Sequence, residues 1–155
     1  MKIKNLVAAA YAPMLKDGTL NTGKIKEYSQ FLIRNKISGV FMNGSTGDFT
    51  SLSTEERKQL TLAWSQNKKD DLYLIDHVGH TNIREAKELA RYASDKVDAI
   101  SVLAPYYFRL NKKSSDIFIK AFFYFYSFYY LPVLFTLLYI TRCNLAAAGL
   151  YYNLN

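Results

Sequence analysis

Cysteine and histidine are scarce in this chain of 155 residues, which has one cysteine, Cys143, and two histidines. A single cysteine excludes an internal disulfide, and so few thiols and imidazoles exclude a zinc site built from Cys and His. The N-terminus lacks a signal-peptide pattern, because lysines alternate with apolar residues over positions 1–4. We therefore expect a protein of the reducing cytoplasm without a metal site.

Acidic residues are missing from the last quarter of the chain. All 13 lie at or before Asp116, whereas 13 of the 24 aromatic residues follow it. The net charge of +7 comes from lysines and arginines spread along the chain, so we expect no nucleic-acid partner. The change in composition divides the chain into residues 1–120 and a divergent apolar tail, residues 121–155.

Four short apolar runs alternate with segments of helical periodicity. The runs cover residues 6–10, 39–43, 72–77 and 99–103, and are typical of strands buried on both faces. Helix starts are indicated by caps at Asn21 or Thr22, at Ser53 with Glu56, and at Asn82 with Glu85. This alternation predicts a parallel sheet with right-handed crossovers, in either a barrel or an open doubly wound sheet.

The sequence Asn43-Gly44-Ser45-Thr46-Gly47-Asp48 lies where the second strand should end. Two glycines let the backbone approach a ligand, and two adjacent hydroxyls with exposed amides could hold a carboxylate or a phosphate. The alternative is a glycine-rich turn in which Ser45 or Thr46 serves only as a cap. The local pattern leaves both interpretations open.

Other candidate residues follow the third and fourth strands. His77 and His80 could act as acid or base, although histidines near a strand end are more often hydrogen-bonded structural residues. Tyr106 and Tyr107 follow Pro105 and either line a pocket or pack over the rim. Met14 and Met42 are expected in the core.

Several of these segments together resemble the N-acetylneuraminate lyase family. The resemblance rests on Ala12-Pro13-Met14, on residues 39–48 with 51–57, on His77-Val78-Gly79 and on Ala104-Pro105-Tyr106-Tyr107, in order and spacing. It covers about three quarters of the chain. The same Gly-Ser/Thr-Thr-Gly loop occurs in dihydrodipicolinate synthase, so a member of that type is the alternative.

The resemblance implies the first four βα units of a (β/α)₈ TIM barrel, since a whole barrel needs roughly 250 residues. It implies a class I aldolase reaction, in which a lysine forms a Schiff base with pyruvate and sialic acid is cleaved to pyruvate and N-acetylmannosamine. Such chemistry needs no cofactor, because the iminium is itself the electron sink. By the resemblance, Ser45 and Thr46 hold the pyruvate carboxylate with help from the Gly47 region, Tyr107 lies near the substrate, and subunits form homo-oligomers.

The chain departs from the family after Lys120. The family has a strand-five segment with a catalytic tyrosine, whereas residues 131–136 read Leu-Pro-Val-Leu-Phe-Thr, and no lysine follows Lys120. We therefore expect no lyase turnover from this polypeptide alone, and no catalytic residue is assigned. We also expect an unclosed barrel to aggregate or to assemble with full-length subunits.

The tail itself allows two interpretations. The first is an out-of-frame or aberrantly spliced continuation of a lyase sequence, with helical character. The second is a membrane anchor, since residues 121–141 are an uncharged run of 21 residues. Pro132 in the middle of that run argues mildly against the anchor. A non-catalytic half barrel is thus the alternative to a member of an active enzyme family.

Overall fold

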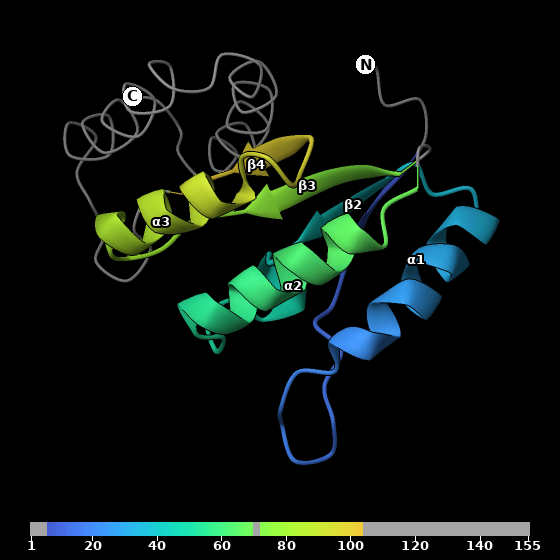
Figure 1. Ribbon diagram of the computed structural model, residues 1–155, viewed down its shortest axis with the longest axis horizontal. Helices are drawn as coiled ribbons and strands as arrows, with labels where there is room; N and C mark the ends of the chain where they lie inside the picture. Colours follow the sequence, from blue (N-terminus) through green and yellow to red (C-terminus); the bar gives the residue numbers. More distant parts are fainter. Residues whose placement is uncertain (1–5, 70–71, 104–155) are drawn as a thin grey trace, which may run out of the picture.

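The computed structural model describes residues 6–69 and 72–103 (Figure 1). Its strands and helices alternate along the chain, as the sequence predicts. They are β1 (Val7–Ala9), α1 (Ile25–Arg34), β2 (Gly39–Met42), α2 (Thr54–Gln66), β3 (Tyr73–His77), α3 (Ile83–Ala93) and β4 (Ala99–Ser101), with 3₁₀ turns η1 (Thr22–Lys24) and η2 (Ser45–Gly47). The helix of the fourth βα unit, which the resemblance implies, and the tail lie outside the described residues.

The order of the strands and the placement of the helices distinguish a barrel from a doubly wound sheet. Its four strands are all parallel and neighbour one another in chain order, β1-β2-β3-β4. The three helices lie side by side along one face of this sheet (Figure 1). A doubly wound sheet reverses its strand order and carries helices on both faces. Within residues 6–103 the arrangement is therefore that of a partial (β/α)₈ barrel.

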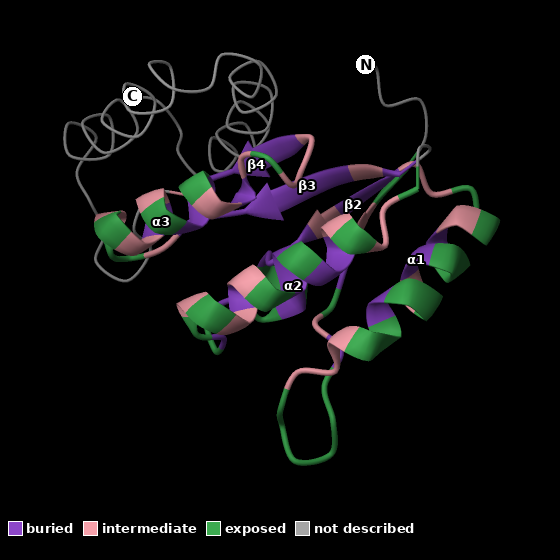
Figure 2. Cartoon of the chain, in the orientation of Figure 1, coloured by how far each residue is buried: buried purple, intermediate pink, exposed green. Residues whose placement is uncertain are grey.

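One side of the sheet and the inner faces of the helices form the main core. Val40, Met42 and Leu74 from the strands are buried together with Leu60 and Trp64 of α2. Figure 2 shows the buried positions along the strands and on the helix sides that face them, with exposed positions on the outer helix surfaces. Because alternate residues of a strand point to opposite faces, the other set of strand residues faces away from the helices.

Strand β1 differs from the prediction of a strand buried on both faces. Its residues Val7 and Ala9 are exposed, and Ala8 between them is half-buried. The reason is its position at the edge of the described sheet, where only β2 lies beside it. The assigned strands are also shorter than the apolar runs, although Leu6 and Ala10 still form backbone hydrogen bonds with Ser38 and Phe41.

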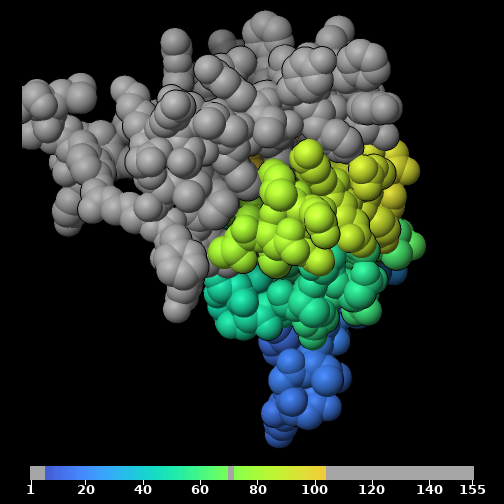
Figure 3. Space-filling model, turned by 90° about the vertical axis from the view of Figure 1, so that its left-hand side faces the viewer, coloured from blue at the N-terminus to red at the C-terminus, as the bar shows by residue number. Residues whose placement is uncertain are grey.

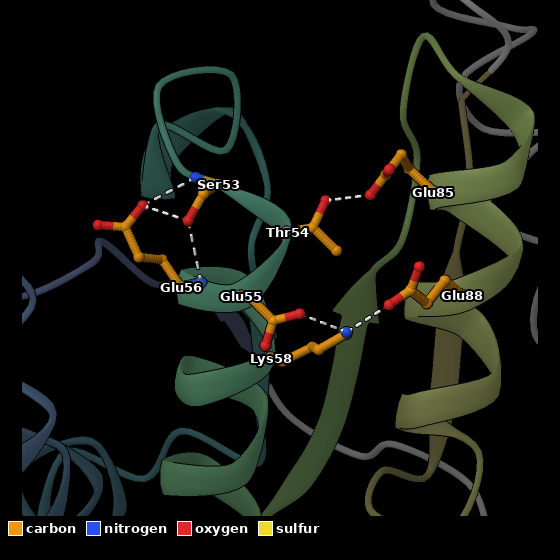
Figure 4. A network of polar contacts seen from close by, with 7 residues as sticks. All are labelled: Ser53, Thr54, Glu55, Glu56, Lys58, Glu85 and Glu88. Carbon is orange, nitrogen blue, oxygen red and sulfur yellow. Dashed lines mark hydrogen bonds and ion pairs between the residues drawn. The ribbon is translucent and has the colours of Figure 1, made fainter.

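The helix starts follow the predicted caps in two of three cases. At α2 the capping box is present: the Ser53 hydroxyl accepts from the Glu56 amide, and the Glu56 carboxylate accepts from the Ser53 amide (Figure 4). At α3 the Asn82 side chain accepts from the Arg84 amide. Glu85 does not complete a second box, because its carboxylate accepts from the Thr54 hydroxyl of α2 instead (Figure 4).

The predicted side-chain cap at α1 is wrong. Neither Asn21 nor Thr22 caps the helix through its side chain. Instead the 3₁₀ turn η1 precedes the helix, and the backbone carbonyls of Asn21 and Thr22 accept from the amides of Lys24 and Ile25. The backbone thus satisfies the amides that a side chain would otherwise cap.

Candidate functional site

The loop after β2 has a backbone that reverses direction sharply. Asn43 and Asp48 have positive φ angles of 54° and 50°, and η2 (Ser45–Gly47) lies between them. The amides of Gly47 and Asp48 donate to the carbonyls of Gly44 and Ser45. The turn is therefore closed by its own backbone.

The hydroxyls of Ser45 and Thr46 are left available by this geometry. Both residues are exposed, and η2 has no side-chain cap. Among the described residues, neither the two hydroxyls nor the Ser45 and Thr46 amides form a hydrogen bond. The interpretation of Ser45 or Thr46 as a cap is therefore wrong. Within residues 6–69 and 72–103, these four donors have no partner and could bind a ligand.

The two glycines of the loop are required by close contacts. A Cβ added at Gly44 would lie 2.3 Å from a ring carbon of Phe41, and one at Gly47 would lie 3.1 Å from the Ala10 carbonyl oxygen. Gly44 thus lets the loop pass over the Phe41 ring. Buried Gly47 lets the same loop rest on the end of β1, which places Ser45 and Thr46 at the carboxyl ends of the strands.

A small pocket opens beneath this loop. Its volume is about 170 Å³, and its wall is formed by Phe41, Gly44, Ser45, His77, Ser101 and Leu103. His77 and Ser101 are register partners on β3 and β4. The pocket therefore lies at the carboxyl ends of β2, β3 and β4, where active sites of parallel α/β barrels lie.

His77 is enclosed by aromatic rings in the wall of this pocket. Its ring makes an edge contact with Phe49 at 4.7 Å and a tilted contact with Phe41 at 6.1 Å between centroids. The side chain is 2% exposed, and neither ring nitrogen has a hydrogen-bond partner among the described residues. Burial, with the nearby Arg57 guanidinium, lowers the pKa of His77 to about 3, although the Ser101 backbone opposes this shift. His77 is therefore a neutral imidazole at physiological pH.

Asp76, the preceding residue of β3, faces the helices. Its carboxylate accepts from the Asn43 amide group at 2.8 Å and from the Thr61 hydroxyl at 2.7 Å. Burial raises the pKa of Asp76 to about 6, against the opposing effect of these hydrogen bonds and of the Arg57 charge. Asn43 reaches Asp76 because its positive φ interrupts the alternation of β2, so that its side chain turns toward α2.

Arg57 connects α2 to the end of β3. It is fully buried on α2, and its guanidinium donates to the backbone carbonyls of His77 and Gly79. The guanidinium also lies 5.3 Å from the centre of the Phe49 ring. Arg57 thus fixes the chain that leaves β3 directly after His77.

The remaining predicted residues are not all brought to this site. The Nδ1 atom of His80 accepts from the Asn82 amide at 2.9 Å, and His80 is not in the pocket wall. Thr46 is also not part of that wall, although it lies beside Ser45. Tyr107 lies outside the described residues. Met42 is in the core as predicted, whereas Met14 is 43% exposed on the loop between β1 and α1, so the prediction for Met14 is wrong.

Residues 6–69 and 72–103 contain no cluster of His, Cys, Asp and Glu suited to a metal ion. None of their helices is long and apolar enough to span a bilayer. Residues 121–141, the candidate anchor, lie outside this range.

Comparison with known proteins identifies the family. A model of the dihydrodipicolinate synthetase family matches residues 2–124. This chain belongs to that family. Of the curated members, N-acetylneuraminate lyase of Danio rerio is 42% identical over 123 residues, which cover 77% of this chain and 40% of that protein.

Solved structures of the family share the fold. N-acetylneuraminate lyase from Mycoplasma synoviae superimposes with a TM-score of 0.73 at 34% identity, over 77% of this chain and 42% of that one. YagE, an E. coli K12 prophage protein of the dihydrodipicolinic acid synthase family, was solved in complex with pyruvate and superimposes with a TM-score of 0.71 at 25% identity, over 76% of this chain and 40% of that one. The chain spans about two fifths of the length of the curated relatives it matches.

The polar network behind the site was missed by the sequence analysis. Asn43, Arg57, Thr61 and Asp76 come from β2, α2 and β3, and nothing in their spacing links them. A usable signal was present at Asp76, because a carboxylate inside an apolar strand needs buried partners.

Proposed function

We propose that residues 1–120 form the carboxylate-binding half of a Schiff-base aldolase barrel, which in its complete form cleaves sialic acid to pyruvate and N-acetylmannosamine. The observation that carries this proposal is the set of hydroxyl and amide donors of Ser45 and Thr46, which have no partner in the described part of the chain and lie beside the pocket at the strand ends. Such donors suit a carboxylate, which only accepts hydrogen bonds.

Each residue of the loop has a separate proposed role in binding the carboxylate. The hydroxyls of Ser45 and Thr46 donate to the carboxylate oxygens, and the amides of the same residues add two donors. Gly47 contributes by its lack of a side chain, since this brings the loop against the Ala10 carbonyl. Tyr107, which follows β4 in the sequence and lies outside the described residues, is proposed to contact the substrate.

Pyruvate binding tests this assignment directly. The wild-type chain should bind pyruvate in a calorimetric titration, and the double variant Ser45→Ala/Thr46→Val should lose most of that binding. Ser51→Ala is the matched control, because Ser51 is an exposed serine a few residues further along the chain. Equal affinity of the double variant and the control would contradict the proposal.

We further propose that these 155 residues alone do not turn over substrate. A class I aldolase needs an amine to form the iminium. The resemblance places that amine on a lysine of a later strand, and these 155 residues have no lysine after Lys120. Borohydride reduction in the presence of labelled pyruvate should leave the chain unlabelled, whereas a full-length N-acetylneuraminate lyase run in parallel should become labelled. A covalent pyruvyl adduct on this chain would refute the proposal.

The partners and location proposed for the chain follow the family. It would act in the cytoplasm, and it would associate with further copies or with full-length subunits rather than remain a monomer. A pull-down of a full-length lyase by the tagged chain tests that association. Recovery of neither the lyase nor untagged copies of this chain would contradict it.

A further inference from the structure

The pocket beneath the β2 loop contains a polar side chain that the proposed function does not use. His77 is 2% exposed, and neither ring nitrogen has a hydrogen-bond partner among the described residues. A buried polar group without a partner costs about 1 to 3 kcal/mol, so native structures rarely leave one in place. The imidazole therefore needs an explanation beyond packing.

Packing alone does not call for a histidine at this position. The neighbours of the ring are Phe41 and Phe49, and a third phenylalanine would suit such surroundings without any unpartnered nitrogen. Gly79 shapes the same space, because a Cβ there would lie 2.6 Å from Cε1 of His77. The site accommodates an imidazole closely but leaves its nitrogens unsatisfied.

The surroundings of His77 indicate what could satisfy it. Ser45 and Ser101 lie in the same pocket wall, together with the apolar side chains of Phe41 and Leu103. A small pocket in which a few polar side chains converge beside apolar ones is typical of a small-molecule site. At about 170 Å³ the space equals several water molecules of roughly 30 Å³ each, which suits a three-carbon acid.

We propose that His77 donates a hydrogen bond to the keto oxygen of a short 2-oxo acid whose carboxylate is held by Ser45. A neutral imidazole has one N–H donor, and a ketone oxygen accepts. The assignment makes His77 a binding residue that distinguishes 2-oxo acids from plain carboxylic acids. It rests on the proposed function, since it requires the carboxylate on the β2 loop.

The test compares two acids that differ only in the ketone. Pyruvate and propanoate are titrated into the full chain, the variant His77→Phe and the variant Ser45→Ala. His77→Phe should weaken pyruvate binding about tenfold, the equivalent of one hydrogen bond, and should change propanoate binding less than about twofold. Ser45→Ala should weaken both acids. His80→Phe is the matched control, because it makes the same change at a histidine outside the pocket wall.

A measurement on the wild-type chain covers the case in which His77→Phe does not fold. With ¹⁵N-labelled histidine, saturating pyruvate should shift a ring-nitrogen resonance of His77, and propanoate should leave it in place. In the titrations, a purely structural role for His77 would not change the ratio of the affinity for pyruvate to the affinity for propanoate.

The outcomes separate the two proposals. The role of His77 is overturned if His77→Phe leaves the ratio of pyruvate to propanoate affinity unchanged, or if pyruvate does not move the His77 resonance. In that case, binding that depends on Ser45 still supports the proposed function. If the wild-type chain binds neither acid, both proposals fail.

Discussion

At the scale of single residues, Asp76 and His77 are neighbours on β3 with opposite surroundings. Asp76 faces α2 and accepts hydrogen bonds from Asn43 and Thr61, whereas His77 lines the pocket on the other face. Burial raises the pKa of Asp76 to about 6 and lowers that of His77 to about 3. Both shifts favour the neutral form, because both side chains are removed from water.

The shifted pKa values of Asp76 and His77 should affect how stability depends on pH. Asp76 binds its proton more tightly when folded, with a pKa of about 6 against 3.8, so its contribution to stability increases as pH falls from 6 to 4. His77 binds its proton less tightly when folded, with a pKa of about 3 against 6.5, so its contribution decreases over the same range. The two effects oppose each other in the wild-type chain.

Asp76→Asn removes the contribution of Asp76 to the pH dependence of stability and leaves that of His77. Between pH 6 and pH 4 the variant should lose on the order of 1 kcal/mol per pH unit relative to wild type, as measured by urea unfolding. Asp95→Asn is the control, because Asp95 is exposed and its hydrogen bond with Lys96 lowers its pKa instead of raising it. If the free energy of unfolding changed with pH in the same way in wild type and in Asp76→Asn, Asp76 would not have the raised pKa described above.

At the scale of secondary-structure elements, α2 links the site to the rest of the sheet. Its start is fixed by the capping box of Ser53 and Glu56, and Lys58 forms ion pairs with Glu55 of α2 and Glu88 of α3 (Figure 4). The ion pairs are partly exposed and contribute little individually. The capping box has the larger effect, because it satisfies amides that nothing else in the helix can reach.

Ser53→Ala should therefore destabilise the chain by about 1 kcal/mol in urea unfolding. Ser65→Ala provides the comparison, since it makes the same change inside the same helix, where the hydroxyl donates only to the Leu62 carbonyl. The effect there should be smaller, because alanine is the better helix former. Equal losses at both positions would show that the capping box contributes nothing specific.

Elements with a strong local signal could be predicted from the sequence, and elements set by tertiary contacts could not. The capping box at Ser53 and the places of the four strands depend on neighbouring residues, so they were predicted correctly, whereas the burial of β1 was not. The missing side-chain cap at α1 and the diversion of Glu85 to Thr54 depend on the backbone path and on a second helix. In the same way, the sequence indicated Ser45 and Thr46 but not the network of Arg57 and Asp76 behind them.

At the scale of the whole molecule, the described residues form a sheet with an exposed edge. Leu6 is 74% exposed beside β1, and Tyr11 and Phe31 are 53% and 52% exposed. The loop between β1 and α1, which contains exposed Leu15, extends from the body of the protein as the blue projection at the bottom of Figure 3. Unpaired strand edges and exposed apolar side chains favour association.

We accordingly expect the chain to self-associate, and sedimentation over a concentration series measures this. Val7→Lys places a charge on edge strand β1 and should lower the weight-average mass. Leu62→Lys, on the outer surface of α2, is the matched control and should have less effect. A wild-type chain that sediments as a monomer at every concentration would contradict this expectation.

Carboxylate binding by the loop after β2 is tested most directly by NMR, which maps pyruvate onto the backbone of the ¹⁵N-labelled chain. Saturable shifts are expected for the Ser45, Thr46 and Gly47 amides, with smaller shifts at the strand ends around His77 and Ser101. Absence of any saturable shift in this loop, or shifts concentrated elsewhere, would contradict the claim that the loop after β2 binds the carboxylate of a 2-oxo acid.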